Sequence, residues 1–90
     1  MLVALIARDN AGALPIRLEN RPAHVTYLKA SEAVQQAGPL LDADGDMCGS
    51  LIVLDVADMA EAEAWMAGDP YGKAGLFASV ELIPWNRVIG

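Results

Sequence analysis

The sequence predicts an α+β fold of order βαββαβ, in which a four-stranded antiparallel sheet carries two helices on one face. Three observations indicate this class. Apolar runs of strand length recur along the chain, two segments between them have helical periodicity, and an Asp-Gly pair marks a tight turn between the central runs. With 90 residues, the chain is expected to form a single domain spanning residues 1–90.

The first half of the chain is expected to contain a strand followed by a long helix. Residues 2–8 are aliphatic on both faces, as in a buried strand. Pro15 suits a helix start, and the helical pattern runs to about Gln36. Pro22 leaves two interpretations open. Either the helix begins near Asn20, or the residues before Pro22 form a separate turn that feeds a helix kinked there.

The apolar stripe of this helix is expected at Leu18, Val25 and Leu28, which recur at helical spacing. Gly38-Pro39 is expected to end the helix, because a proline interrupts its hydrogen bonding. Leu40-Leu41 then begins a short second strand.

The second half of the chain repeats the alternation of strand, helix and strand. Asp44-Gly45 is typical of a hairpin turn, and residues 51–56 follow it as the third strand. Residues 58–68 form the second helix, with a capping pair at their start and a glycine at their end. Residues 76–85 complete the sheet as the fourth strand, so the order is that of the ferredoxin-like arrangement.

The apolar residues on both faces of the first and third strands predict an oligomer. Two helices cover one face of the sheet only, so the other face would meet water in a monomer. Hydrophobic residues make up 54% of the chain, which is more than so small an interior can hide. We therefore predict a homodimer in which two sheets pack face to face.

Composition argues against several classes of function. A net charge of −6 does not suit nucleic acid, and no apolar run approaches the roughly 20 residues of a membrane span. Cys48 is the only cysteine, which fits a cytoplasmic location. Asp42, Asp44 and Asp46 lack the glycine and glutamate that a calcium loop needs at its sixth and twelfth positions, so a solvated hairpin tip is expected there. The chain has no Gly-rich phosphate loop and no Cys/His metal spacing, and no metal or other cofactor is expected.

His24 is the only histidine and the first candidate for chemistry. Arg17 and Arg21 precede it by about two turns and one turn on a similar helix face, which suits an anionic ligand. Asp69 lies between a glycine and Pro70 just past the second helix, where it could orient the imidazole. Taken alone, these residues are more typical of a surface or capping histidine and an ordinary Asp-Pro turn.

Ordered fragments of the chain resemble the YciI-like (YCII-related) family. The fragments are Arg17 to Val25 with Tyr27-Leu28, Ala37 to Leu40, Gly49-Ser50, Ala64-Trp65, Asp69 to Tyr71, Ala74-Gly75 and Val80 to Trp85. The resemblance implies a ferredoxin-like fold of the dimeric α+β barrel superfamily and a His/Asp pair at His24 and Asp69. It also implies that the Ser50 hydroxyl lies at the same pocket.

Two functional hypotheses follow. The first is a cofactor-independent small-molecule enzyme of lyase, isomerase or hydrolase type, with His24 as general acid/base and Asp69 orienting it. The residues expected to bind a small anionic or aromatic ligand are Arg17, Arg21, Ser50, Tyr71 and Trp85. The alternative is a non-catalytic ligand-binding or accessory dimer, in which the His/Asp hydrogen bond is structural. A cofactor-free monooxygenase or lactone isomerase is a third interpretation, which rests on the range of the superfamily alone.

Overall fold

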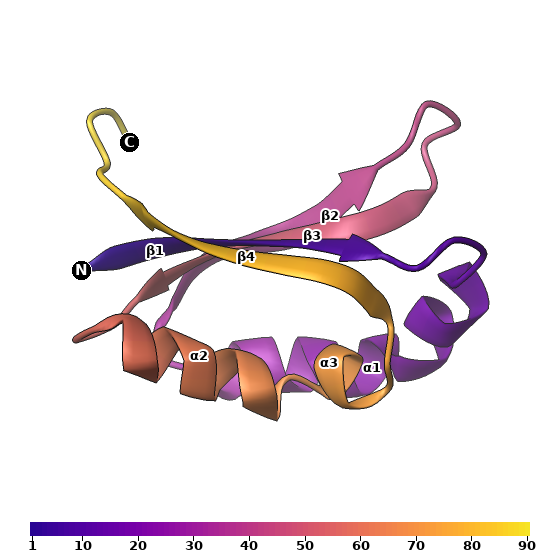
Figure 1. Cartoon of the computed structure of the whole chain (residues 1–90), viewed down its shortest axis with the longest axis horizontal. Helices are drawn as coiled ribbons and strands as arrows, with labels where there is room; N and C mark the ends of the chain where they lie inside the picture. The colour runs from indigo at the N-terminus through magenta and orange to yellow at the C-terminus, as the bar shows by residue number, and fades with distance from the viewer.

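A computed structural model describes all 90 residues and contains seven helices and strands. They are β1 (Leu2–Asp9), α1 (Leu14–Ala30), β2 (Val34–Leu41), β3 (Met47–Asp55), α2 (Met59–Gly68), α3 (Pro70–Lys73) and β4 (Phe77–Trp85). The strands form one antiparallel sheet in the order β2-β3-β1-β4. All three helices lie against the same face of this sheet (Figure 1). The predicted ferredoxin-like fold is therefore confirmed.

The apolar core lies between the sheet and the helices. Alternate residues of β1, namely Val3 and Leu5, are buried and pair with Leu54 and Ile52 of β3. These side chains pack with Trp65 of α2 in one cluster. Burying one such aliphatic side chain contributes about 1.5–3 kcal/mol, so this layer holds the helices onto the sheet.

The boundary between the first helix and the second strand differs from the prediction. α1 ends at Ala30, and β2 occupies Val34–Leu41 where a helical end at Gln36 was expected. Pairing with β3 overrides the local helical pattern, because strand formation depends on a partner far along the chain. Gly38 and Pro39 lie inside this edge strand, where a residue without an N–H is tolerated.

Pro22 lies inside a continuous helix. α1 begins at Leu14, has Pro15 in its first turn, and continues through Pro22 to Ala30. Neither a start near Asn20 nor a separate preceding turn is therefore correct. Pro22 is exposed, so water can reach the backbone group that its missing N–H leaves without a partner.

α1 turns polar side chains toward the interior. Its two buried residues are Arg17 and His24, whereas Leu18, expected to face the core, is 53% exposed. Val25 and Leu28 are half-buried. Because burying a cation or an imidazole is costly without a partner, both side chains need polar partners inside the fold.

The second half of the fold follows the prediction with small shifts. Gly45 takes a positive φ of 84° at the hairpin tip, and Asp58 caps α2 by accepting a 2.9 Å hydrogen bond from the Glu61 amide. β3 begins at Met47, four residues before the expected start at Leu51. The one-turn helix α3 was not predicted.

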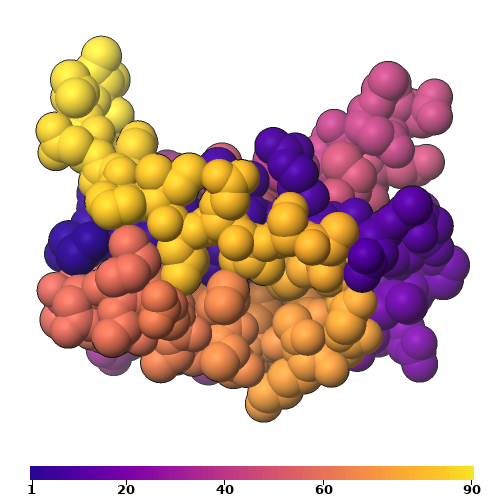
Figure 2. All heavy atoms as spheres, viewed as in Figure 1, coloured from indigo at the N-terminus to yellow at the C-terminus, as the bar shows by residue number.

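The face of the sheet opposite the helices is open and partly apolar. Leu51, Ile83 and Trp85 are each exposed by about two fifths on this side of the strands. The C-terminal tail and the β2–β3 hairpin rise from its two ends, so the face is concave between them (Figure 2). No helix of the chain is both long and apolar enough to span a membrane.

Candidate active site

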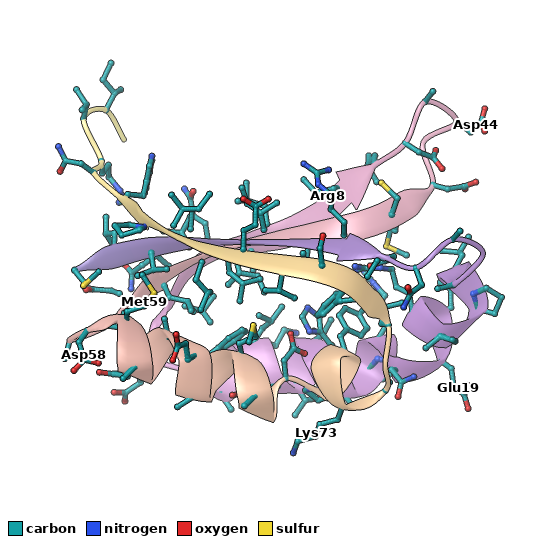
Figure 3. The ribbon with its side chains drawn as sticks, viewed as in Figure 1. Arg8, Glu19, Asp44, Asp58, Met59 and Lys73 are labelled. Carbon is teal, nitrogen blue, oxygen red and sulfur yellow. The ribbon has the colours of Figure 1, made fainter.

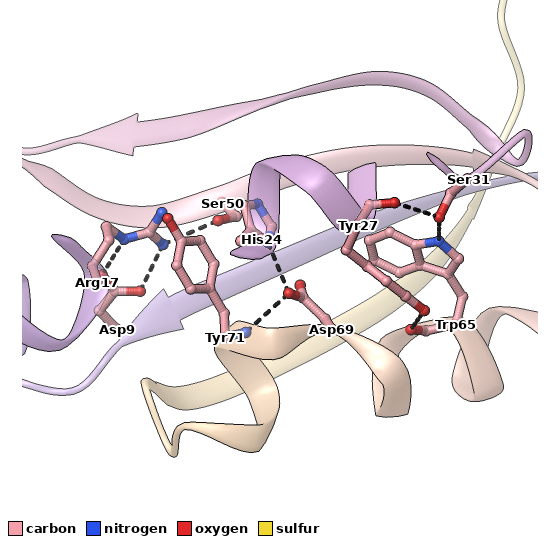
Figure 4. A network of polar contacts seen from close by, with 9 residues as sticks. All are labelled: Asp9, Arg17, His24, Tyr27, Ser31, Ser50, Trp65, Asp69 and Tyr71. Atoms are coloured by element: carbon pink, nitrogen blue, oxygen red, sulfur yellow. Dashed lines mark hydrogen bonds and ion pairs between the residues drawn. The ribbon is translucent and has the colours of Figure 1, made fainter. Parts of the chain in front are cut away.

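His24 and Asp69 meet inside the protein. Nδ1 of His24, from the middle of α1, lies 2.7 Å from Oδ1 of Asp69, which sits between α2 and α3 (Figure 4). The two residues are 6% and 1% exposed. Two residues that are 45 positions apart thus form the contact that the sequence analysis expected.

The turn around Asp69 explains how this carboxylate is aimed. Gly68 ends α2, and Pro70 opens α3 with Asp69 as its N-cap. The Tyr71 amide donates a 3.0 Å hydrogen bond to the same Oδ1 atom that contacts His24. Oδ1 is thereby held by the backbone of α3, while the buried Oδ2 has no hydrogen-bond partner.

The hydrogen bond to Asp69 also determines which ring nitrogen of His24 is free. An ionised carboxylate only accepts hydrogen bonds, so Nδ1 carries the proton and Nε2 keeps its lone pair in the neutral ring. Nε2 makes no hydrogen bond within the protein, and the ring lines a cavity. His24 can therefore accept a proton from a ligand while Asp69 stabilises the imidazolium that forms.

Tyr71 packs directly on the His24 ring. The two ring centroids are 3.8 Å apart with an interplanar angle of 16°, and the Arg17 guanidinium carbon lies 4.6 Å from the Tyr71 centroid. Burial raises the pKa of Tyr71, and the positive charges of Arg17 and Arg21 counteract this only in part. Tyr71 is therefore a neutral phenol at physiological pH, and its ring fixes one face of the imidazole.

Arg17 is held by a carboxylate that the sequence analysis did not identify. Its Nε and Nη2 atoms donate to Asp9 over 2.7 and 2.9 Å, and Nη2 also donates to the Ser50 hydroxyl over 3.0 Å. Burial lowers the pKa of Arg17, but the hydrogen bonds and charge of Asp9 outweigh this effect and raise it. Arg17 is thus a neutralised cation that positions Ser50.

A cavity of about 380 Å³ connects these groups. It is open to solvent on one side and is lined by residues of α1, β2, the first half of β3, and α3. Five residues named from the sequence line it: Arg17, Arg21, His24, Ser50 and Tyr71. Asp69 lies behind the His24 ring, outside the lining. No group of three or more His, Cys, Asp or Glu side chains is placed to hold a metal ion.

Trp85 does not reach this cavity. It pairs with Leu2 in the β1–β4 ladder, on the open face of the sheet, and is 41% exposed. β4 forms the edge of the sheet opposite β2, so the expectation that Trp85 forms a wall of the pocket is not met within one chain. Lys29 of α1, which was not among the candidate residues, is exposed and also lines the cavity.

A second polar network ties α1 to α2 beside the His24–Asp69 pair. The Tyr27 hydroxyl donates to the Trp65 carbonyl over 2.7 Å, and the Trp65 indole donates to the Ser31 hydroxyl over 3.0 Å (Figure 4). We call Tyr27, Ser31 and Trp65 the helix clamp. Tyr27 follows His24 by one turn and Trp65 precedes Asp69 by one turn, so the clamp sets the spacing of the two helices at the pair.

Gly68→Ala is expected to disturb this clamp. A Cβ atom at Gly68 would lie 2.5 Å from the Tyr27 hydroxyl oxygen, so either this hydroxyl leaves the Trp65 carbonyl or the two helix ends separate. We expect the free energy of unfolding to fall by about 1–3 kcal/mol in chemical denaturation. Gly72→Ala is the matched control, because its Cβ would meet nothing closer than 3.4 Å. Equal stability of the two variants would contradict this prediction.

Comparison with known proteins identifies the family to which this chain belongs. The model of the YCII-related domain family matches residues 1–86. The chain therefore belongs to the YCII-related family. Protein YciI of Escherichia coli O6:H1 is 31% identical to it, over 98% of this chain and 99% of that protein.

Solved structures agree with this assignment. The chain is similar to the 5-chloro-2-hydroxyhydroquinone dehydrochlorinase TftG from Burkholderia phenoliruptrix, solved with 2,5-dihydroxybenzoquinone. The TM-score is 0.89 and the identity 35%, over 96% of this chain and 94% of that one. An antibiotic biosynthesis monooxygenase has a TM-score of 0.58 at 14% identity, over 97% of this chain and all of that one, which reflects the fold alone.

Proposed function

We propose that this protein is a cofactor-independent small-molecule enzyme that performs acid/base chemistry through His24. One observation carries the proposal. The buried Asp69 carboxylate holds Nδ1 of the ring. Nε2 has no hydrogen-bond partner within the protein, and the ring lines a cavity of about 380 Å³. A positioned imidazole of this kind contributes roughly 10²–10⁴-fold to a reaction limited by proton transfer.

The similarity to a dehydrochlorinase supports elimination as the reaction type. In this reaction Nε2 removes a proton from a substrate O–H or C–H bond. The freed electron pair moves into the substrate and expels the leaving group as an anion. The net change is loss of H–X, and no oxidant or reductant is consumed. Asp69 stabilises the imidazolium, which then returns its proton to water.

Two neighbouring side chains would position the substrate. Tyr71 presents its ring against His24 and limits where a flat substrate can lie. Ser50, whose hydroxyl accepts from Arg17, is oriented so that its own proton is available to an oxygen of the substrate. In these roles, neutral side chains position the reacting part of the substrate beside His24, and proton transfer is left to the imidazole alone.

The test of this function is halide release. Chelator-treated, cofactor-free protein is expected to release chloride from 5-chloro-2-hydroxyhydroquinone, or from related halogenated hydroquinones with and without a ring carboxylate, faster than the spontaneous reaction. Ion chromatography measures the chloride, and absorbance follows the quinone product. Absence of turnover across the panel would show that elimination of a halide is the wrong reaction.

We also propose that two copies associate through the open face of the sheet. Leu51 of the inner strand β3 and Ile83 of the edge strand β4 expose apolar surface on this face, and Val88 and Ile89 do so on the tail that rises beside it. A second sheet would bury these groups. An apolar sheet face of this kind is usually covered by another layer of protein. The alternative function, a non-catalytic binding dimer, would share this assembly.

Light scattering tests the assembly. We expect a mass of twice the 9.5 kDa of one chain. The double variant Leu51→Glu with Ile83→Glu is expected to be monomeric, because the charges would be buried between the two sheets. Leu18→Glu is the control, since Leu18 is exposed on the helical layer away from this face. A monomeric wild-type protein at micromolar concentration would overturn the proposal.

A further inference from the structure

Cationic side chains dominate the cavity at His24. Three of the chain's six lysine and arginine residues line it, namely Arg17, Arg21 and Lys29, and no aspartate or glutamate does. The whole chain carries twelve acidic residues and a net charge of −6, so its average surface is acidic. A cleft whose charge opposes that of the rest of the protein concentrates anions.

The three cations are not equivalent. Arg17 is paired with Asp9 and donates to Ser50, so its charge is already compensated. Arg21 and Lys29 have no carboxylate within ion-pair distance. They therefore remain available to a ligand, and they lie on either side of His24 along α1.

Arg21 is exposed on α1 and lines the cavity one turn before His24. Its positive charge lowers the pKa of the buried Tyr71 phenol, against the larger effect of burial, and the Tyr71 ring stacks on His24. Lys29 follows Arg21 by eight residues, or about 12 Å along the helix axis. Lys29 is therefore farther from Tyr71 than Arg21 is, and its charge attracts an anionic ligand at longer range.

The rest of the lining suits a small ring with oxygen substituents. Val25, Leu28 and Val34 supply apolar surface, and Gln35 and Gln36 supply amides that can bind hydroxyl or carbonyl oxygens. A cavity of about 380 Å³ is at the small end of the range for ligand pockets.

We propose that the substrate is a small hydroxylated ring or enol that carries a carboxylate, which Arg21 binds while Lys29 adds attraction. The carboxylate is remote from the reacting bond, which faces His24. This assignment of substrate class rests on the proposed function of His24. Bidentate pairing with a carboxylate is the geometry that a guanidinium favours.

Two matched probes test the proposal: 2,5-dihydroxybenzoate and its neutral analogue 2,5-dihydroxybenzamide. Their Kd values can be measured from the NMR signals of His24, which are unambiguous because the chain has one histidine. We expect 2,5-dihydroxybenzoate to bind roughly tenfold more tightly than 2,5-dihydroxybenzamide at low salt. This difference in affinity is expected to shrink as ionic strength rises.

Three variants separate the contributions. Arg21→Gln is expected to weaken binding of the benzoate roughly tenfold and Lys29→Gln roughly threefold, with little effect on the benzamide. Lys73→Gln removes the same charge from an exposed residue of α3 that points away from the molecule (Figure 3), and should change neither Kd.

Equal affinities for the two probes, or no binding of either, would overturn the substrate class. An equal loss of benzoate affinity in Lys73→Gln and Arg21→Gln would also overturn the substrate class, because the loss would then reflect the net charge of the protein and not a contact in the cavity. Binding does not require turnover, so such a failure leaves the elimination hypothesis standing. Conversely, selective binding of the benzoate without any halide release would contradict the proposed function and not the class of ligand.

Discussion

His24→Asn is expected to lower kcat/KM for halide release by roughly 10²–10⁴-fold. The asparagine amide nitrogen takes a place close to that of Nδ1, so it can still donate to Asp69 and keep the buried carboxylate paired. The variant has no group at the position of Nε2, and it therefore lacks the atom that accepts the substrate proton. Loss of turnover would thus report on the missing base rather than on a rearranged site.

The stability of the His24→Asn variant is the control for this experiment. Losing the ring that stacks on Tyr71 is expected to cost about 1–2 kcal/mol of the free energy of unfolding, which chemical denaturation measures. Turnover in a folded His24→Asn protein that equalled the wild-type rate would contradict the role of His24. It would favour the non-catalytic alternative, in which the hydrogen bond to Asp69 is structural.

Asp69→Asn is expected to lower kcat by roughly 10²-fold or more while KM changes little. An amide oxygen can still accept from the Tyr71 amide, so the cap of α3 persists, but a neutral amide does not stabilise an imidazolium by charge. KM is expected to stay near the wild-type value because Asp69 is outside the cavity lining. Burying an unpaired amide N–H at the position of Oδ2 is expected to cost about 1–3 kcal/mol of stability.

Asp58→Asn is the matched control for Asp69→Asn. Asp58 also caps a helix with its carboxylate, but it lies exposed at the start of α2 (Figure 3). We expect a small loss of stability and an unchanged kcat. If Asp69→Asn lost stability while its kcat stayed at the wild-type value, Asp69 would be a capping residue only.

Elements with strong local signals were predicted within a few residues. The capped start of α2 and the turn at Gly45 depend on contacts between residues close in the chain, which a sequence displays directly. The fold class follows from the same signals, because alternating strands and helices of these lengths have few ways to form one sheet. The His24–Asp69 contact was inferred from the order of the helices and from the family resemblance.

Elements that depend on distant partners were predicted poorly. β2 forms where helical periodicity continued, because it pairs with β3, and Pro22 lies in a continuous helix between the buried residues Arg17 and His24. Leu18 points outward for a related reason. The buried face of α1 is set by Arg17 and His24, whose partners Asp9 and Asp69 offset the cost of burial.

The sequence by itself determined the order of the elements, the family and the residues most suited to acid/base chemistry. These depend on local hydrogen bonding, side-chain periodicity and residue type. Only the tertiary structure decided that Asp9 neutralises Arg17, that Arg21 and Lys29 stay unpaired in the cavity, and that Trp85 lies on the open face. Those outcomes depend on which charges and faces the sheet brings together, because ion pairing and burial act through space.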